Sequence, residues 1–291
     1  MQDIISGQTS KWRELSDRVT IPCLAFRTIT GYICADAKIK RHPAEHYLSY
    51  YGDTMNTMKN TARIAGLWYL LMAMTGPLGL MYIPSGIIVA GDTAATVNNI
   101  VANEVLYRLS VVSNLICQTA FIFVVLALYR LFKDVDKKYA RLMVALVLVS
   151  VPIAFISVLN QTAPLILLND DGYAKVFGQN QLNAYILLFL ELFNHTNSLA
   201  EIFWGLWLLP FGVLTYKSGF IPKIFGVLLI IACFGYLASS AATFLFPEAK
   251  DMVGIFTSVS GFAGEISILL WFLIKGVKDQ PMNANAASSH Q

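Results

Sequence analysis

The chain has 291 residues, of which 56% are hydrophobic and 13% are charged. A soluble globular domain carries about 25% charged residues, so this composition excludes an ordinary cytosolic domain and a disordered chain. The formal net charge of +3 arises from 21 basic and 18 acidic residues, a balance that provides no basic surface for nucleic acid. The four cysteines show no paired spacing, which excludes a disulfide-rich scaffold. The remaining class is a polytopic membrane protein.

The first 57 residues are polar and contain no apolar run long enough to cross a membrane. They include Cys23, Cys34, His42 and His46, but ten residues separate the two cysteines. Structural zinc sites usually have about two to four residues between paired cysteines, so a zinc site in this segment is disfavoured. Met58 opens a short basic segment directly before the first apolar run. We therefore expect residues 1–57 to be an extension outside the membrane domain, either an upstream-start artefact or a cytoplasmic tail.

Six apolar runs follow this extension. A helix needs roughly 20 mostly apolar residues to cross a hydrocarbon core of about 30 Å. These runs are also too long and too continuous for the alternating strands of about 10 residues that build membrane barrels. The sequence predicts an all-α membrane domain at 58–278 and a disordered tail at 279–291. The expected spans are 62–83, 109–132, 142–168, 188–216, 225–246 and 255–275.

Lysine and arginine near the ends of these runs predict the orientation. Eleven of them fall on the side that faces residues 133–138, and three fall on the opposite side. Because cytoplasmic loops carry the excess of basic residues, both termini are expected in the cytoplasm.

One outer loop contains a further predicted helix. Asp92 is suited to cap a helix that runs to about Glu104. Val97, Val101 and Val105 would share one face of it. This face is expected to pack against the bundle, with the membrane surface as the alternative.

Four segments of the chain are distinctive. Three of them are KNTARIAGLWYLL at 59–71, VLALYRLFKDVDK at 125–137 and the Gly-Glu pair at 264–265. The most specific is IFWGLWLLPFGVLTYKSGFIPKIFGVLLI at 202–230. Together they resemble a known bacterial membrane family, domain of unknown function 4386. The resemblance covers about 58–278 and implies a six-helix bacterial inner-membrane protein. It implies no activity and supplies no catalytic residue.

The fourth apolar run carries an unusual polar stripe. Ionisable groups at membrane depth cost at least about 2.5–3.5 kcal/mol on insertion scales, so they need a structural or functional reason. At 100° per residue the five side chains fall within about 120° of one helix face, which we expect to point into the bundle or into a water-filled cavity. They are Glu191, Asn194, His195, Ser198 and Glu201.

Other spans supply possible partners for this stripe: Asn114, Gln118, Asn160, Gln161 and Glu265. Three interpretations remain open. The polar groups could join helices through hydrogen bonds in a structural or sensory component. They could bind or relay a proton, a cation or a small molecule. They could also belong to an intramembrane enzyme in which His195 acts with carboxylates.

Signatures of known chemistry give no support to the enzyme interpretation. The sequence lacks a phosphate-binding loop, a His-Glu-x-x-His zinc motif and a Gly-x-Ser-x-Gly nucleophile elbow. No cofactor is predicted, and the metal question stays open because a catalytic zinc needs about three protein ligands. The expected partners are the lipid bilayer and a small molecule or ion.

Overall fold

The computed structural model describes the backbone of residues 43–277 and the side chains of residues 58–277. Within these residues the chain is all-α, as predicted. Residues 1–42 of the predicted extension and the predicted tail at 279–291 lie outside the described residues. The helices are α2 (Pro43–Pro77), η1 (Leu78–Tyr82), α3 (Ile83–Ile87), α4 (Thr93–Ala102), α5 (Glu104–Phe132), α6 (Lys137–Leu168), α7 (Asp171–Phe177), α8 (Gln179–Leu206), α9 (Leu208–Lys217), α10 (Lys223–Leu245), η2 (Pro247–Ala249), α11 (Lys250–Gly261), η3 (Phe262–Ile266) and α12 (Ser267–Ile274).

Within the described residues, six helical segments are long and apolar enough to cross a membrane, which confirms the predicted polytopic architecture. Each overlaps one predicted span and extends beyond it at one end or both. Helix α2 begins at Pro43 and runs through the predicted boundary at Met58, so part of the polar extension is helical. The spans are Met58–Ile87, Glu104–Phe132, Lys137–Leu168, Gln179–Lys217, Lys223–Leu245 and Pro247–Ile274.

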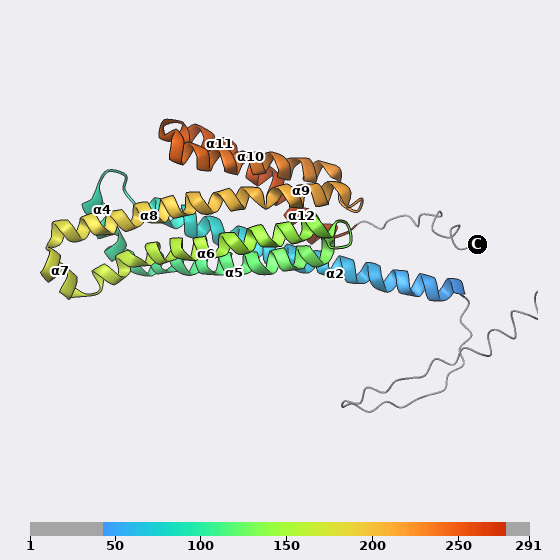
Figure 1. Cartoon of the computed structure of the whole chain (residues 1–291). Coiled ribbons are helices and arrows are strands. Elements are labelled where there is room, and N and C mark those ends of the chain that lie inside the picture. The colour runs from blue at the N-terminus through green and yellow to red at the C-terminus, as the bar shows by residue number, and fades with distance from the viewer. Residues whose placement is uncertain (1–42, 278–291) are drawn as a thin grey trace, which may run out of the picture. The chain divides into compact units, whose positions relative to one another are not determined.

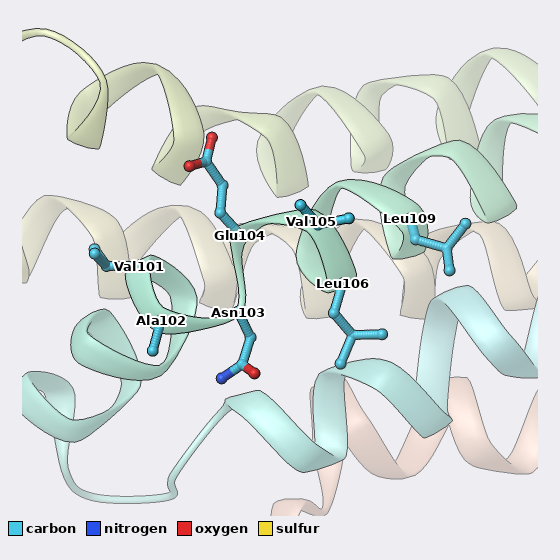
Figure 2. A pocket seen from close by; sticks show the side chains of 7 residues that line it. All are labelled: Val101, Ala102, Asn103, Glu104, Val105, Leu106 and Leu109. Atoms are coloured by element: carbon cyan, nitrogen blue, oxygen red, sulfur yellow. The ribbon is translucent and has the colours of Figure 1, made fainter.

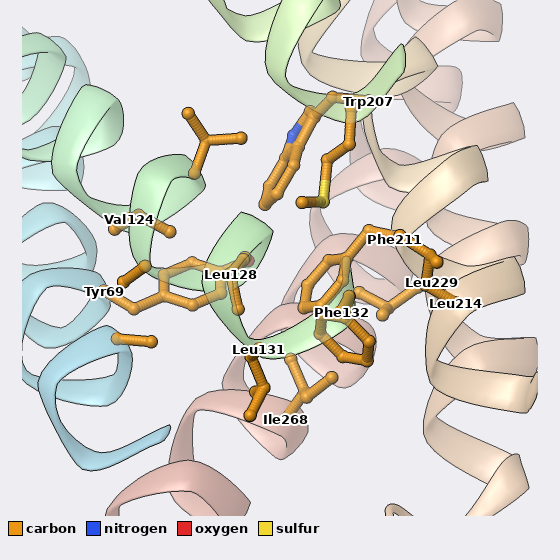
Figure 3. Close-up of a cluster of buried hydrophobic side chains, with 14 of the residues drawn as sticks. Tyr69, Val124, Leu128, Leu131, Phe132, Trp207, Phe211, Leu214, Leu229 and Ile268 are labelled. Carbon is orange, nitrogen blue, oxygen red and sulfur yellow. The ribbon is translucent and has the colours of Figure 1, made fainter. Parts of the chain in front are cut away.

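The spans pack side by side around an apolar core. Helix α6 lies between α5 and α8, while α10 packs against α8, α9 and α11 (Figure 1). Aromatic rings join these helices at the centre. The ring of Trp207 stacks on Phe211 at 5.2 Å and meets the edge of Phe121 at 5.0 Å. Figure 3 shows Trp207 and Phe211 facing Leu128, Phe132 and Ile268 from neighbouring helices.

Helices α9 and α10 approach each other closely at two glycines. A Cβ added to Gly226 would lie 2.6 Å from the carbonyl oxygen of Gly212, and one added to Gly212 would lie 2.7 Å from that of Gly226. Real Cβ atoms do not tolerate such distances. Small residues therefore allow these two backbones to touch, as in other membrane helix pairs.

Three of the spans depart from regular α-helix. The fourth is interrupted at Trp207, between α8 and α9, three residues before Pro210. Proline removes a backbone donor and its ring crowds the carbonyl four residues earlier, which accounts for the interruption. The first and sixth spans contain the π-helical turns η1 and η3. Such turns occur frequently at functional sites.

The predicted helix between the first and second spans is present, but the face that it buries differs from the predicted one. The Asp92 carboxylate accepts a hydrogen bond from the backbone N–H of Ala95 at 2.8 Å and so caps α4. Val97 and Ile100 are buried, whereas Val101 is 59% exposed. The predicted face through Val101 and Val105 is wrong because the helix breaks at Asn103 and Val105 belongs to α5.

A polar contact links the two short connections on the basic side. Asp136 accepts hydrogen bonds from the backbone N–H groups of Lys138 and Tyr139 and so caps α6. Its carboxylate also accepts one from Lys217 Nζ at 3.1 Å. The Lys217 bond, aided by the two backbone donors, holds the pKa of Asp136 below its usual value.

Candidate functional site: a polar cleft between the helices

A cleft of about 610 Å³ lies between α2, α5, α8, α10, α11 and η3. Ligand sites typically have about 300–1,000 Å³ and combine apolar walls with a few polar groups. This cleft fits that description. Its polar lining comprises Tyr69, Gln118, Asn194, Asn197, Ser198, Glu201, Tyr236, Ser239, Lys250, Thr257, Ser258 and Glu265.

Glu265 is the most firmly held of these side chains. It lies on the π-helical turn η3, and its Oε2 accepts a hydrogen bond from the Tyr69 hydroxyl at 2.7 Å. Its Oε1 accepts one from the Tyr236 hydroxyl at 2.9 Å. Hydrogen bonds to a carboxylate are among the strong ones in proteins. Glu265 is therefore fixed by residues of the first and fifth spans, both of which line the cleft.

Two other polar groups in the cleft have an oxygen without a partner. Glu201 Oε2 and Gln118 Oε1 are buried and form no hydrogen bond within the described residues. Gln118 is 4% exposed, so its amide is enclosed by protein. Leaving a buried polar atom unsatisfied costs about 1–3 kcal/mol. Rotation of either side chain toward a hydrogen-bond donor in the cleft would recover this free energy.

Aromatic and thioether side chains form the apolar walls of the cleft. Trp207 is buried, with the ring of Tyr69 at 6.3 Å and that of Phe121 at 5.0 Å. Trp204 and Met72 complete this wall. The cleft thus offers a large apolar surface beside a small set of carboxylate and amide groups.

Only part of the predicted polar stripe on α8 lines the cleft. Asn194, Ser198 and Glu201 line it, whereas Glu191 and His195 do not. Both of these are exposed, and the His195 ring lies 6.1 Å from the ring of Phe244. The stripe is about 120° wide, and only the part that carries Asn194, Ser198 and Glu201 reaches the cleft.

The amides predicted as partners separate into two further groups. Gln161 Oε1 accepts a hydrogen bond from Asn114 Nδ2 at 2.7 Å, and Gln161 Nε2 donates to Ser110 Oγ at 3.0 Å. The Tyr107 hydroxyl donates to the Gln161 carbonyl at 2.7 Å. Asn160 instead donates to Thr196 Oγ1 at 3.4 Å. These bonds join α5 to α6 and α6 to α8, away from the cleft lining.

Comparison with known proteins places the chain in a family. Residues 64–276 match the family described as Domain of unknown function (DUF4386). The chain belongs to this family. An uncharacterized protein of Archaeoglobus fulgidus is 36% identical over 89 residues, which are 31% of this chain and 51% of that protein. The chain thus matches about half the length of this relative. No solved structure matches the chain.

The cleft of this DUF4386 protein lies entirely within the matched range, because its lining extends from Tyr69 to Ile266. Several residues that line the cleft were not among the predicted site residues: Tyr69, Asn197, Trp204, Tyr236 and Lys250. A phenolic hydroxyl inside an apolar span was the available signal for Tyr69 and Tyr236, since a buried hydroxyl usually requires a partner.

A second hollow of the DUF4386 protein, of about 520 Å³, lies where α4 meets α5. Figure 2 shows Asn103 and Glu104 on opposite sides of the backbone at this junction. Glu104 already accepts two hydrogen bonds from Arg108, at 2.6 and 2.8 Å, and the two side chains are 41% and 53% exposed. With its carboxylate paired and open to solvent, this hollow is a weaker candidate than the cleft.

Proposed function

We propose that this DUF4386 protein binds a small polar molecule in the cleft, within a cytoplasmic membrane. The observation that carries the proposal is the pair of unpartnered oxygens, Glu201 Oε2 and Gln118 Oε1. They line the same cleft as the carboxylate of Glu265. An enclosed acceptor without a donor contributes nothing to helix packing. The side chains of Glu201 and Gln118, unlike that of Asn114, line a cleft of ligand size.

The Gln161 network provides an internal comparison. There the oxygen and the nitrogen of the Gln161 amide are both satisfied by groups on α5, while Asn114 Oδ1 has no partner among the described residues and does not line the cleft. That arrangement is what helix-joining hydrogen bonds produce. The cleft differs because a volume suited to a ligand adjoins its unsatisfied acceptors. This contrast favours binding over a purely structural or sensory role for the cleft residues.

Other roles receive less support from the geometry. An enzyme that uses His195 as a base would need this side chain in the cleft, but it lies outside the lining, beside Phe244. A proton relay through the cleft would have Glu201 and Glu265 as its titratable carboxyls but would lack His195. Transport of the bound molecule, with binding at this cleft as its first step, is compatible with the six spans.

Thermal unfolding of the purified full-length protein in detergent tests the proposal. A panel of small cations, anions and neutral polar compounds is screened at millimolar concentration. A bound ligand stabilises by RT ln(1 + [L]/Kd), about 2.7 kcal/mol at a hundredfold excess over Kd. We expect at least one compound to raise the unfolding temperature of the wild type by several degrees.

Variants assign any such effect to the cleft. Glu265→Gln keeps two hydrogen-bonding groups for the tyrosines and removes the charge, so the shift should disappear. Glu191→Gln is the matched control, because it removes a carboxylate on the same helix as Glu201 but outside the cleft. Its shift should equal that of the wild type. A panel without effect on the wild type, or with equal effects on Glu265→Gln, would overturn the proposal.

A further inference from the structure

We infer that the ligand is a small organic monocation, a primary or secondary amine in its ammonium form with an apolar body. This inference rests on the proposed function and names the chemical class of its ligand. Three properties of the cleft support it: the balance of charge, the kind of hydrogen-bonding atom left open, and the aromatic wall.

The acidic groups that line the cleft outnumber the basic ones. Two carboxylates, Glu201 and Glu265, stand against one ammonium group, Lys250. Among the described side chains no ion pair joins Lys250 to either carboxylate. A buried charge is tolerated only when it is paired. A bound monocation would allow both carboxylates to ionise, with Lys250 neutralising one and the ligand the other.

The hydrogen-bonding atoms of the cleft that are left without a partner are acceptors. Glu201 Oε2 and Gln118 Oε1 both lack a donor. The two oxygens of Glu265 already accept hydrogen bonds from Tyr69 and Tyr236. A ligand that fits this set must donate, and a primary or secondary ammonium carries N–H donors together with its positive charge. A quaternary ammonium provides the charge without the donors.

A metal ion suits the cleft less well than an ammonium. In the part of the chain that the structure describes, no group of three or more His, Cys, Asp or Glu side chains could hold a metal ion. The walls instead present Trp204, Trp207 and Phe121. Aromatic faces attract cations and also accommodate an apolar body. The volume of about 610 Å³ exceeds the space of a bare ion and suits an organic molecule.

The test compares compounds of similar shape and different charge. Phenethylammonium is set against 2-phenylethanol, 3-phenylpropanoate and trimethyl(phenethyl)ammonium at neutral pH, with hexylammonium and sodium chloride alongside. Unfolding temperatures of the full-length protein in detergent give apparent affinities. We expect the two primary amines to stabilise the wild type most, the quaternary amine to act more weakly, and the alcohol, the anion and sodium to have no effect.

Two variants sharpen the test. Glu201→Gln should weaken amine binding by about tenfold or more, because hydrogen bonds to charged groups are the stronger ones. Lys250→Met should tighten it, since the variant removes the competing cation. Glu191→Gln should leave it unchanged. These variants carry the prediction even if Glu265→Gln proves unstable.

The outcomes separate this inference from the proposed function. If the anion or a neutral compound stabilises the protein through Glu265 better than the amines do, the amine class is wrong and binding at the cleft stands. If sodium stabilises as much as phenethylammonium, the amine class is again wrong. If neither these compounds nor the wider panel affects the wild type, both proposals fail.

Discussion

The hydroxyl of Tyr69 lies 2.7 Å from Oε2 of Glu265, although 196 positions separate the two residues. The bond joins the first span to the π-helical turn of the sixth. Tyr236 holds the other oxygen of the same carboxylate from the fifth span. One carboxylate therefore ties three spans together at the wall of the cleft. Its loss should affect both stability and binding.

Tyr69→Phe tests the structural part of this arrangement. The variant removes one donor and leaves Glu265 Oε2 without it, which should lower the free energy of unfolding by about 1–3 kcal/mol. Thermal or denaturant unfolding in detergent measures the loss. Tyr185→Phe is the control, because Tyr185 is 42% exposed and its hydroxyl makes no hydrogen bond within the described residues. Equal stability of the two variants would show that the Tyr69 bond contributes nothing.

Gln161→Leu tests the network that joins α5 to α6. The substitution leaves Ser110 and Asn114 without their side-chain partner. Interhelical hydrogen bonds in membranes contribute about 0.6 kcal/mol each on average, so a loss of about 1–2 kcal/mol is expected. Ligand binding at the cleft should remain unchanged, because Gln161 does not line it. A variant that stays as stable as the wild type but binds no ligand would reverse these assignments.

Asp136→Asn tests the contact between the two short connections. The pKa of Asp136 is lowered in the folded state, chiefly by Lys217. The contribution of this carboxylate to stability is therefore present above its unfolded pKa of about 3.9. It is lost as the pH falls through the lower folded value.

Unfolding temperatures of wild type and Asp136→Asn, measured from neutral pH down to below the unfolded pKa, reveal this contribution. The wild type should be the more stable at neutral pH, and the difference should shrink in acid. Because both side chains are partly exposed, added salt should also reduce it. A difference that stays constant with pH would exclude the Asp136 carboxylate as its source.

Reporter fusions test the predicted orientation. Alkaline phosphatase requires disulfides that form in the periplasm and not in the cytoplasm. Fusions after residue 136 or after residue 220 should be inactive in a bacterial host, while a fusion after residue 175 should be active. The opposite pattern would mean that the excess of lysine and arginine near residues 133–138 does not set the topology.

The spans and part of the cleft could be predicted from the sequence because both follow from local patterns. Hydropathy alone located all six spans. The period of an α-helix placed Asn194, Ser198 and Glu201 on one face, and they do share the cleft. Local patterns could not reveal which neighbour each face meets. His195 and Glu191 belong to the same stripe, yet neighbouring helices leave them outside the cleft.

The remaining differences depend on tertiary packing. Asn160 and Gln161 are adjacent in sequence, but 100° of helix rotation directs one toward α8 and the other toward α5. The partnership of Glu265 with Tyr69 and Tyr236 joins the first span to the fifth and sixth, so no window of sequence contains it. The break at Trp207 follows from Pro210, although proline within a membrane helix does not always produce one. Helix α6 continues through Pro152 and Pro164.

Equilibrium binding tests the central claim, ligand binding at the cleft, most directly. The compound that best stabilises the wild type is prepared in radiolabelled form and titrated onto full-length protein in lipid nanodiscs. Wild type and Glu191→Gln should each bind one equivalent per chain with the same affinity, and Glu265→Gln should bind none. Equal binding by Glu265→Gln and the wild type would contradict the assignment of the cleft as the binding site.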